Sequence, residues 1–428
     1  MNMNYKNKIA NVILGLILAL SGCQKKVAEE ESADLSLTAP SKKLYIATGQ
    51  CNSGLGVTSF STQNSSRRIS KLDLATKNLS TFLDLTEAYV GGGFAINTGV
   101  QALVDNGSNI LMLTENAVEM ADRKIYSIPK SSPFNTEIYS TDPLALTQTA
   151  AHVTRDLAKD VDGTLLFSKS IGIEKIGTNN LRIPQGANPW VNAPAAPCAT
   201  SITFMSSVKV LPPFTGSTNG KIVYTHAGAT TALNRLGIIN AEGYLIPSNC
   251  IAGVQISAIP HTYATNVTGP TPIVFNAVAG SSPTASVFIK TGNGPGVIGK
   301  LIVAYSAAVA TETSNSVNLN YALVAWDVSE TSLTVASLSA PVVLSRQLDA
   351  VFGISALAYD AETSSLYVAT ASQTGVMNQT TAGYGYKIEK FNYNLTTNEA
   401  TLVREDDKPY LERTPGTKCI TSMVLGNE

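Results

Sequence analysis

A small group of side chains suited to chemistry lies between positions 152 and 156, where His152, Arg155 and Asp156 follow one another closely. Imidazole nitrogens and a carboxylate oxygen bind metal ions and polar ligands. His226 ends a strand of the following repeat, and that strand is expected to finish on the same side of the fold. The sequence therefore predicts a candidate ligand site formed by His152, Arg155, Asp156 and His226.

A purely structural role explains the same residues, and the sequence favours it. Asp156 occupies the position held by Ala102 and Ala356 in other repeats, on a strand expected to line a central channel. A carboxylate there is stabilised if Arg155 or a neighbouring lysine pairs with it, while the histidines bind loop carbonyl groups. We therefore assign no metal and no cofactor, and a metal ion at the channel mouth remains a hypothesis.

Sequence motifs for other chemistry are absent. The chain has three histidines and lacks His-Glu-x-x-His, Gly-x-Ser-x-Gly and Gly-Lys-Ser/Thr. Asp160 to Gly163 resembles the start of a calcium loop, but no glutamate follows at the closing distance, so a hairpin turn is expected. No catalytic residue is identified, and the sequence favours a protein that is not an enzyme.

The charge composition disfavours nucleic-acid binding. Lys plus Arg is 30 and Asp plus Glu is 31, a formal net charge of −1, which produces no field that attracts nucleic acid. Charged residues are only 14% of the 428 residues, where about 25% is usual. The hydrophobic content of 44% is enough for a core and excludes a largely disordered chain.

The first residues have the pattern of an export signal. Met1 to Lys8 contains two lysines and no acid, and Val12 to Leu20 is an apolar run too short to span a bilayer. The run ends in Leu20-Ser21-Gly22-Cys23, which resembles the lipobox of bacterial lipoproteins. That resemblance implies cleavage before Cys23, lipidation of Cys23 and a membrane anchor. Gln24, in place of aspartate, implies the outer membrane, on either its periplasmic or its exposed side.

Three segments follow from these patterns. Residues 1–22 form the signal peptide, residues 23–43 the lipidated cysteine with a tether, and residues 44–428 the folded domain. The 19 residues from Lys25 to Lys43 contain an acidic run and few large apolar side chains, which is typical of a solvated linker. Such a linker has an r.m.s. reach of roughly 25 Å.

The folded domain is expected to be all-β because short alternating strands recur, with no helical period. One five-residue strand recurs at 44–48, 110–114, 165–169, 222–226, 301–305 and 366–370. Each copy is followed by a second strand, at 69–76, 125–132, 173–180, 235–242, 323–330 and 388–395. A further strand precedes some pairs, at 100–105, 154–159 and 354–359, and a weaker fourth strand follows at 80–85 and 400–403.

Four antiparallel strands repeated in this way predict a β-propeller. Leu44-Tyr45-Ile46-Ala47-Thr48 and Leu366 to Thr370 resemble strands of the bacterial propellers of the YVTN and quinoprotein-like kind. The spacing favours six blades, with seven as the alternative, and an insertion at 247–283. The segment Cys419 to Leu425 has the pattern of a first strand, so the two ends of the domain are expected to share one blade and close the ring.

Five cysteines fit an exported protein. With Cys23 lipidated, four cysteines remain and permit three pairings. The closing blade is expected to bring Cys419 next to Cys51, which predicts disulfides Cys51–Cys419 and Cys198–Cys250 in an oxidising compartment. Four buried free thiols are the alternative.

Long connections are expected at one end of the blades, and we call this end the long-loop face. It comprises residues 52–66, 86–99, 184–200, 247–283, 306–320 and 372–385. Scaffolded long loops concentrate binding residues, and Trp190 and Tyr384 are candidate ligand-binding residues there. The sequence favours a lipid-anchored scaffold that binds an envelope protein or glycan. A propeller hydrolase or lactonase with a channel-mouth site is the alternative, supported by the fold resemblance alone.

Overall fold

The computed structural model describes part of the domain that follows the expected tether. The described residues are 41–50, 68–85, 99–115, 124–140, 154–160, 162–169, 172–181, 191–192, 202–211, 221–228, 235–240, 254–255, 262–263, 281–292, 297–307, 321–329, 342–344, 353–373, 384–413 and 418–428. All of them except Ser41 belong to one compact unit, Lys42–Glu428. The expected signal peptide and all of the expected tether except residues 41–43 lie outside the described residues. No helix within the described ranges is both long and apolar enough to cross a bilayer.

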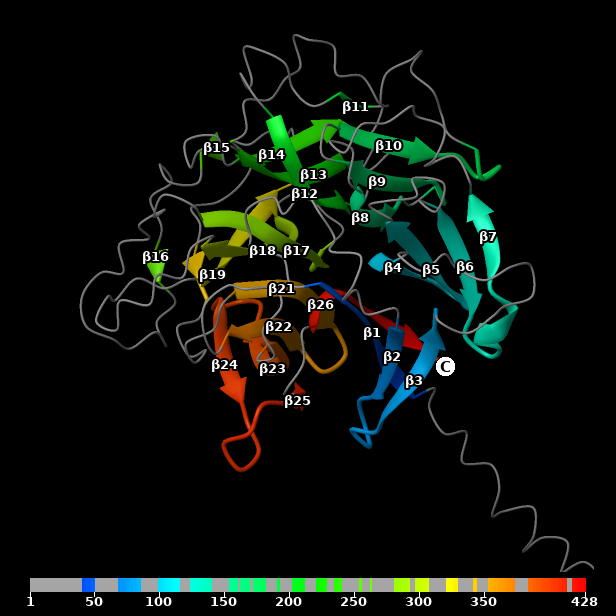
Figure 1. Ribbon diagram of the computed structural model, residues 1–428. Helices are drawn as coiled ribbons and strands as arrows, with labels where there is room; N and C mark the ends of the chain where they lie inside the picture. Colours follow the sequence, from blue (N-terminus) through cyan, green and yellow to red (C-terminus); the bar gives the residue numbers. More distant parts are fainter. Residues whose placement is uncertain are drawn as a thin grey trace, which may run out of the picture. The chain divides into compact units, whose positions relative to one another are not determined.

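The described strands pair into six small sheets (Figure 1). The sheet shared by the two ends of the unit has the order β26 (Lys418–Asn427), β1 (Lys42–Gln50), β2 (Arg68–Asp73), β3 (Leu79–Asp84). Next along the chain are β4 (Gly99–Asn106), β5 (Asn109–Glu115), β6 (Ile125–Pro129) and β7 (Glu137–Ser140), with the 3-10 helix η2 (Pro133–Asn135) before β7. The third sheet has β8 (Thr154–Lys159), β9 (Leu165–Lys169), β10 (Gly172–Ile176) and β11 (Val191–Asn192).

Three sheets complete the set. The fourth has β12 (Ile202–Leu211), β13 (Lys221–Gly228), β14 (Arg235–Asn240) and β15 (Val254–Gln255). The fifth has β17 (Ser281–Lys290), β18 (Val297–Ala307), β19 (Tyr321–Ser329), β20 (Val342–Val343) and β16 (Thr262–Tyr263), and its β16–β20 pair is parallel. The sixth has β21 (Gly353–Asp360), β22 (Ser365–Gln373), β23 (Tyr384–Asn394) and β24 (Glu399–Val403), with β25 (Leu411–Arg413) also paired to β23.

The first strands of the sheets contact one another in a closed cycle. β26 contacts β4, β4 contacts β8, β8 contacts β12, β12 contacts β17, β17 contacts β21, and β21 contacts β26. Later strands of each sheet follow outward, as Figure 1 shows. The unit is thus a propeller-like ring of small, almost wholly antiparallel sheets, which confirms the all-β, propeller-like prediction at this level.

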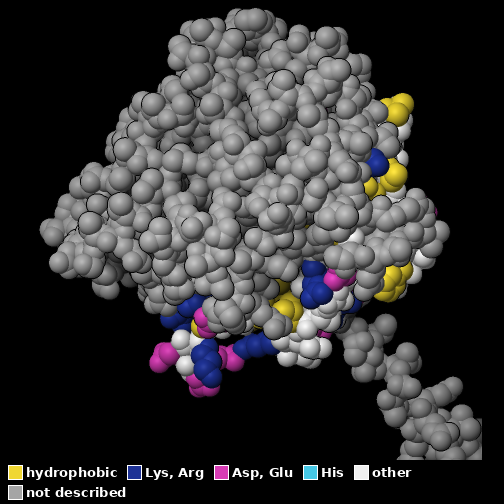
Figure 2. All heavy atoms as spheres, in the orientation of Figure 1, with side chains coloured by type: hydrophobic (Ala, Val, Ile, Leu, Met, Phe, Trp, Pro, Cys, Tyr) yellow, Lys and Arg dark blue, Asp and Glu magenta, His cyan; other side chains and the backbone are white. Residues whose placement is uncertain are grey.

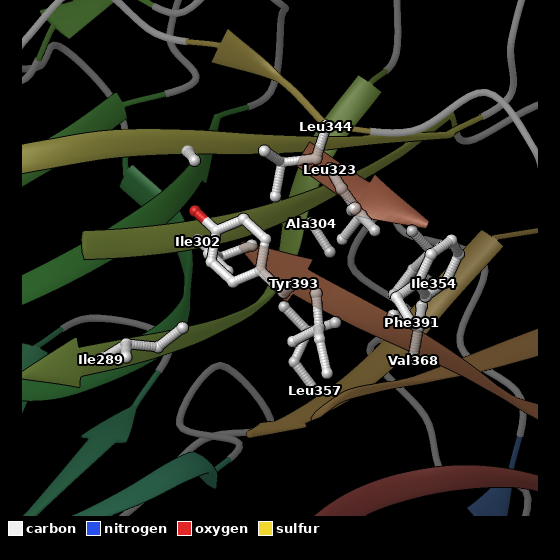
Figure 3. Packing of buried hydrophobic residues seen from close by; sticks show 13 residues of the cluster. Ile289, Ile302, Ala304, Leu323, Leu344, Ile354, Leu357, Val368, Phe391 and Tyr393 are labelled. Atoms are coloured by element: carbon white, nitrogen blue, oxygen red, sulfur yellow. The ribbon is translucent and has the colours of Figure 1, made fainter. Parts of the chain in front are cut away.

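Both faces of a sheet are buried because the repeated strand carries apolar side chains that point in turn to one face and to the other. Successive side chains of a strand point to opposite faces. In β1, Leu44 and Ile46 pack in the cluster shared with the sixth sheet, whereas Tyr45 and Ala47 pack in the cluster shared with the β4–β7 sheet. Between the fifth and sixth sheets, Figure 3 shows aliphatic and aromatic side chains from both meeting in one cluster. These intersheet clusters form the core.

The two ends of the unit meet in one sheet, as predicted. β1 pairs with β26 from Lys42 opposite Asn427 to Gln50 opposite Lys418. The hydroxyl of Tyr45 donates a hydrogen bond to Glu428 Oε1 over 2.9 Å, and Lys71 Nζ also binds this carboxylate at 2.9 Å. Because β26 pairs along β1, β1 has a partner on both sides and β26 takes the inner position of this sheet.

Hairpin turns mark the opposite end of the sheets, which we call the turn face, and the longer connections 177–190, 241–253 and 330–341 also start there. It contains the turns at 74–78, 107–108, 130–136, 160–164, 177–181, 361–364 and 395–398. The predicted Asn-Gly and Asp-Gly hairpins are confirmed, with Gly107 at φ +73° and Gly163 at φ +84°. Glycine suits these positions because it has no Cβ to oppose the left-handed conformation.

Two first strands, β12 and β17, were not identified from the sequence. Small polar residues interrupt the apolar pattern of both strands, at Ser206 and Ser207 in β12 and at Ser281, Ser282 and Thr284 in β17. The expected insertion at 247–283 contributes β15 to the fourth sheet and β16 to the fifth, and the described residues within it form no additional sheet.

Candidate functional site

The strand register locates the long-loop face. Thr48 at the end of β1 lies opposite Arg68, and Arg68 lies opposite Asp84. The β1–β2 and β3–β4 connections therefore leave from the same end of this sheet. Gly99 lies opposite Glu115, so the next sheet has the same arrangement. Most residues of the predicted loops lie outside the described ranges, and the register locates their attachment points.

Every first strand has a β-bulge close to this end. The register shifts between Val100 and Ala102, between Thr154 and Leu157, and at matching places in the other first strands, and β12 has a second shift between Ile202 and Phe204. The extra residue at each equivalent shift is polar: Gln101, Arg155, Ser206, Thr284, Ser355 and Thr421. Bulges redirect side chains and are common next to functional sites. Bulges therefore form a repeated feature around the inner ring, and Arg155 and Asp156 fall within one of them.

Asp156 binds the neighbouring sheet through its carboxylate. Its Oδ2 atom accepts a 2.6 Å hydrogen bond from Lys209 Nζ and a 3.0 Å hydrogen bond from the backbone N–H of Val208, both in β12. Its Oδ1 atom accepts from the N–H of Leu157 at 2.9 Å. The prediction that a neighbouring lysine pairs with Asp156 is confirmed. Charge-assisted hydrogen bonds are shorter and stronger than neutral ones, and this one joins two sheets.

Ser422 in β26 makes the equivalent contact in another sheet. Ser422 lies opposite Ala47, as Ala102 lies opposite Leu113 and Ala356 opposite Ala369. Its Oγ atom accepts a hydrogen bond of 3.1 Å from the N–H of Leu103 in the next sheet. A polar residue in this position therefore joins consecutive first strands at two places in the ring. Ser422 could have been found from the sequence by extending the alignment of Asp156 to the C-terminal strand.

Thr421, the bulge residue beside Ser422, makes another contact across the same boundary. Its hydroxyl donates a hydrogen bond of 3.0 Å to the carbonyl oxygen of Val100 in β4.

Lys209 was missed by sequence reasoning because its strand, β12, was not identified. Once that strand is placed beside β8, its lysine is the natural partner for Asp156.

The remaining candidate residues are placed only in part. Arg155 lies in β8, His226 lies in β13 opposite Met205 and Arg235, and Tyr384 begins β23 opposite Gln373. The side chains of these three residues lie outside the described part, as do His152 and Trp190 altogether. Convergence of His152, Asp156 and His226 therefore remains a prediction. Within the described ranges, no group of three or more His, Cys, Asp or Glu side chains has the arrangement of a metal site.

Of the five cysteines, Cys419 lies within the described residues. Cys419 lies in β26 opposite Gly49. Gly49 precedes Cys51 by two residues in the chain. Cys51, Cys198 and Cys250 lie outside the described residues, as does Cys23. The predicted disulfides therefore stay predictions, although the register brings Cys419 to the end of the sheet from which the Cys51 segment continues.

Comparisons were made with family models, curated sequences and solved structures. No family model matches the chain, and no curated protein sequence matches it. A protein of unknown function from Bacteroides caccae has a TM-score of 0.44 and 9% identity, covering 91% of this chain and 100% of its own. The major Malassezia sympodialis allergen Mala s 1 has a TM-score of 0.37 and 12% identity, covering 71% of this chain and 81% of its own.

Proposed function

We propose that this protein is a lipid-anchored envelope scaffold that binds a protein or glycan partner through its long-loop face. One observation carries the proposal: the described register brings long connections, such as 51–67 and 86–98, to one end of the ring, while hairpin turns such as 107–108 and 361–364 lie at the other end. Loops held by a rigid scaffold are common binding elements. The pairing of Asp156 with Lys209 supports a structural role for this carboxylate rather than a free catalytic one.

The anchor is lipidated Cys23, in the outer membrane. The lipobox-like Leu20-Ser21-Gly22-Cys23 supports lipidation and Gln24 supports the outer membrane. Several acyl chains on one residue hold a protein stably, whereas one chain binds only marginally. We further propose that each of the six sheets is one blade, and the closed cycle of first strands supports this number.

Two disulfides, Cys51–Cys419 and Cys198–Cys250, are proposed to hold the long-loop face. The position of Cys419 opposite Gly49 supports the first bond. Peptide mapping without reduction should recover both cross-linked peptides. A free thiol at any of these four cysteines excludes the corresponding bond.

Cross-linking of the lipoprotein in intact cells tests the function. We expect one dominant envelope protein or glycan attached through residues 52–66, 184–200 or 372–385. The substitutions Trp190→Ala and Tyr384→Ala should each reduce its recovery, whereas Thr396→Ala on the turn face should not. Recovery of no partner above background would overturn the scaffold, and recovery through the turn face would overturn the choice of surface.

A further inference from the structure

Two aliphatic hydroxyl groups of the sixth sheet are buried without a hydrogen-bond partner. They are the Oγ atom of Ser355, at the bulge of β21, and the Oγ1 atom of Thr370 in β22. Ile354, next to Ser355, lies opposite Thr370, and the turn 361–364 that joins the two strands lies at the other end. Both hydroxyls are therefore near the long-loop face. A buried polar group without a partner destabilises the folded state.

The threonines that match Thr370 in the first two sheets are hydrogen-bonded. The hydroxyl of Thr48 donates over 3.4 Å to the carbonyl oxygen of the residue opposite it in β2. Thr114 donates to the carbonyl oxygen of Lys124 over 3.1 Å and accepts the N–H of this residue at 3.0 Å. Thr370 has the same position in its strand and is fully buried, but it makes no such bond.

Ser355 also differs from its counterparts in other first strands. Thr421, at the same bulge position, donates to a carbonyl oxygen of the next sheet. The following positions in two other sheets hold Ser422 and Asp156, which accept N–H groups from the next sheet. In β21 the following residue is Ala356, which has no polar side chain. The side chains at this bulge therefore give no hydrogen bond to a neighbouring sheet.

The turn-face end of the sixth sheet is bonded to the first sheet. Lys42 Nζ in β1 pairs with Asp360 Oδ1, at the end of β21, over 2.5 Å. Tyr410, just before β25, donates to the carbonyl oxygen of Leu74 over 3.0 Å. The hydroxyl of Tyr359 interacts with the neighbouring turn. Figure 2 shows Lys, Arg, Asp and Glu side chains gathered on the projecting segment near β24 and β25.

Thr370 faces the fifth sheet. It alternates with Leu366 and Val368, which belong to the cluster between the fifth and sixth sheets (Figure 3), and alternate residues of a strand share a face. Within the sixth sheet, β22 and β23 pair without a register shift, and Arg404 pairs with Glu389 over 2.6 Å. The sheet is thus well bonded internally, whereas this hydroxyl at its boundary is not.

We propose that the sixth sheet is a hinged element, whose long-loop end separates from its neighbours while its turn-face end stays attached. Separation exposes the hydroxyls of Ser355 and Thr370 to water, so each of them lowers the free energy of opening. Elements that move in function have low local stability. The 372–385 connection, one of the segments expected to contact the partner, belongs to this sheet. Opening therefore changes the position of a proposed contact.

Thiol labelling of the folded protein tests the opening. Val368→Cys places a thiol two residues from Thr370, on the face toward the fifth sheet. Met112→Cys is the matched control, two residues from Thr114 and also fully buried. After subtraction of the labelling of the unsubstituted protein, we expect Val368→Cys to react about tenfold faster than Met112→Cys. Equal rates would overturn the hinge.

Removal of the hydroxyls provides a second test. Thr370→Val keeps the shape and removes the unsatisfied group, so the urea midpoint should rise and the labelling of Val368→Cys should slow by about fivefold or more. Ser355→Ala should act in the same direction. Thr114→Val removes a bonded hydroxyl and should lower the urea midpoint. A lower midpoint for Thr370→Val would show that this hydroxyl is bonded in the folded protein and would overturn the inference. Neither test uses the partner, so each is independent of the proposed function.

Discussion

The carboxylate of Asp156 in β8 and the ammonium group of Lys209 in β12 form an ion pair of 2.6 Å between two sheets. Their side chains are 17% and 25% exposed, so the pair is partly shielded from water. Val208, next to Lys209, donates its N–H to the same carboxylate. Asp156 therefore links consecutive first strands of the ring.

Removal of this link should weaken the ring without affecting partner binding. Asp156→Ala leaves the Lys209 ammonium and the Val208 N–H without their acceptor, and we expect a loss of about 1–3 kcal/mol in unfolding free energy. Asp156→Asn keeps an acceptor and should cost less. Urea denaturation measures both. A variant as stable as the parent contradicts the structural role, and loss of a measurable turnover would favour the channel-mouth enzyme.

Lys130 should stabilise the boundary between the first two sheets. It is 8% exposed, pairs with Asp105 at 2.7 Å, and donates to Asn427. Lys130→Met keeps the apolar stem and removes the charge, and we expect a loss of about 1–3 kcal/mol. Lys77→Met is the control, because solvent screens its pair with the exposed Glu405 and this pair should contribute little to stability. Equal urea midpoints for the two variants would refute this difference.

Gly299 should not tolerate a side chain. A Cβ at this position would overlap the ring of Phe288 and the carbonyl oxygen of Ile289 on the paired strand β17. We expect Gly299→Ala to cost about 1–3 kcal/mol through overpacking, or to prevent folding. Gly107→Ala is the matched comparison: its Cβ would meet no atom within 4 Å, so only the φ of +73° opposes it, at about 1–2 kcal/mol. Thermal melts measure the stability of both variants. A smaller loss of stability for Gly299→Ala than for Gly107→Ala would contradict the prediction.

Acid should destabilise the ring through Asp360. Burial alone would raise the pKa of Asp360, but hydrogen bonds from Lys42, Thr363 and the N–H of Glu362 lower it below its usual value. A carboxyl group with a lowered folded-state pKa contributes stability above its unfolded pKa, about 4, and loses that contribution as the pH falls through the folded value.

The corresponding variant should be less sensitive to acid. Asp360→Asn should be less stable than the parent at neutral pH by about 1–3 kcal/mol, and the difference should shrink as the pH falls below about 4. Urea midpoints across this range measure it, with Lys42→Met as a second route to the same loss. A difference that stays constant with pH would show that the ion pair is not responsible.

The sequence by itself determined the strand content and much of the pairing within sheets. The continuous apolar residues of Leu44–Ala47 and Leu366–Ala369 indicate burial on both faces, and such a pattern is local to each strand. The pairing of the first and last strands followed from the same pattern in Cys419–Leu425. The Asn106-Gly107 turn was predictable because its conformation depends on adjacent residues alone.

Tertiary structure decided the relations between sheets. Asp156 and Lys209 are 53 positions apart, and Ser422 and Leu103 are 319 apart, so no local pattern couples them. Only the ring, which lays each first strand beside the next, brings these groups within hydrogen-bonding distance. Exposure was also decided at this level. Phe134 and Leu181 are apolar and yet exposed, because exposure depends on packing against distant segments rather than on the residue type.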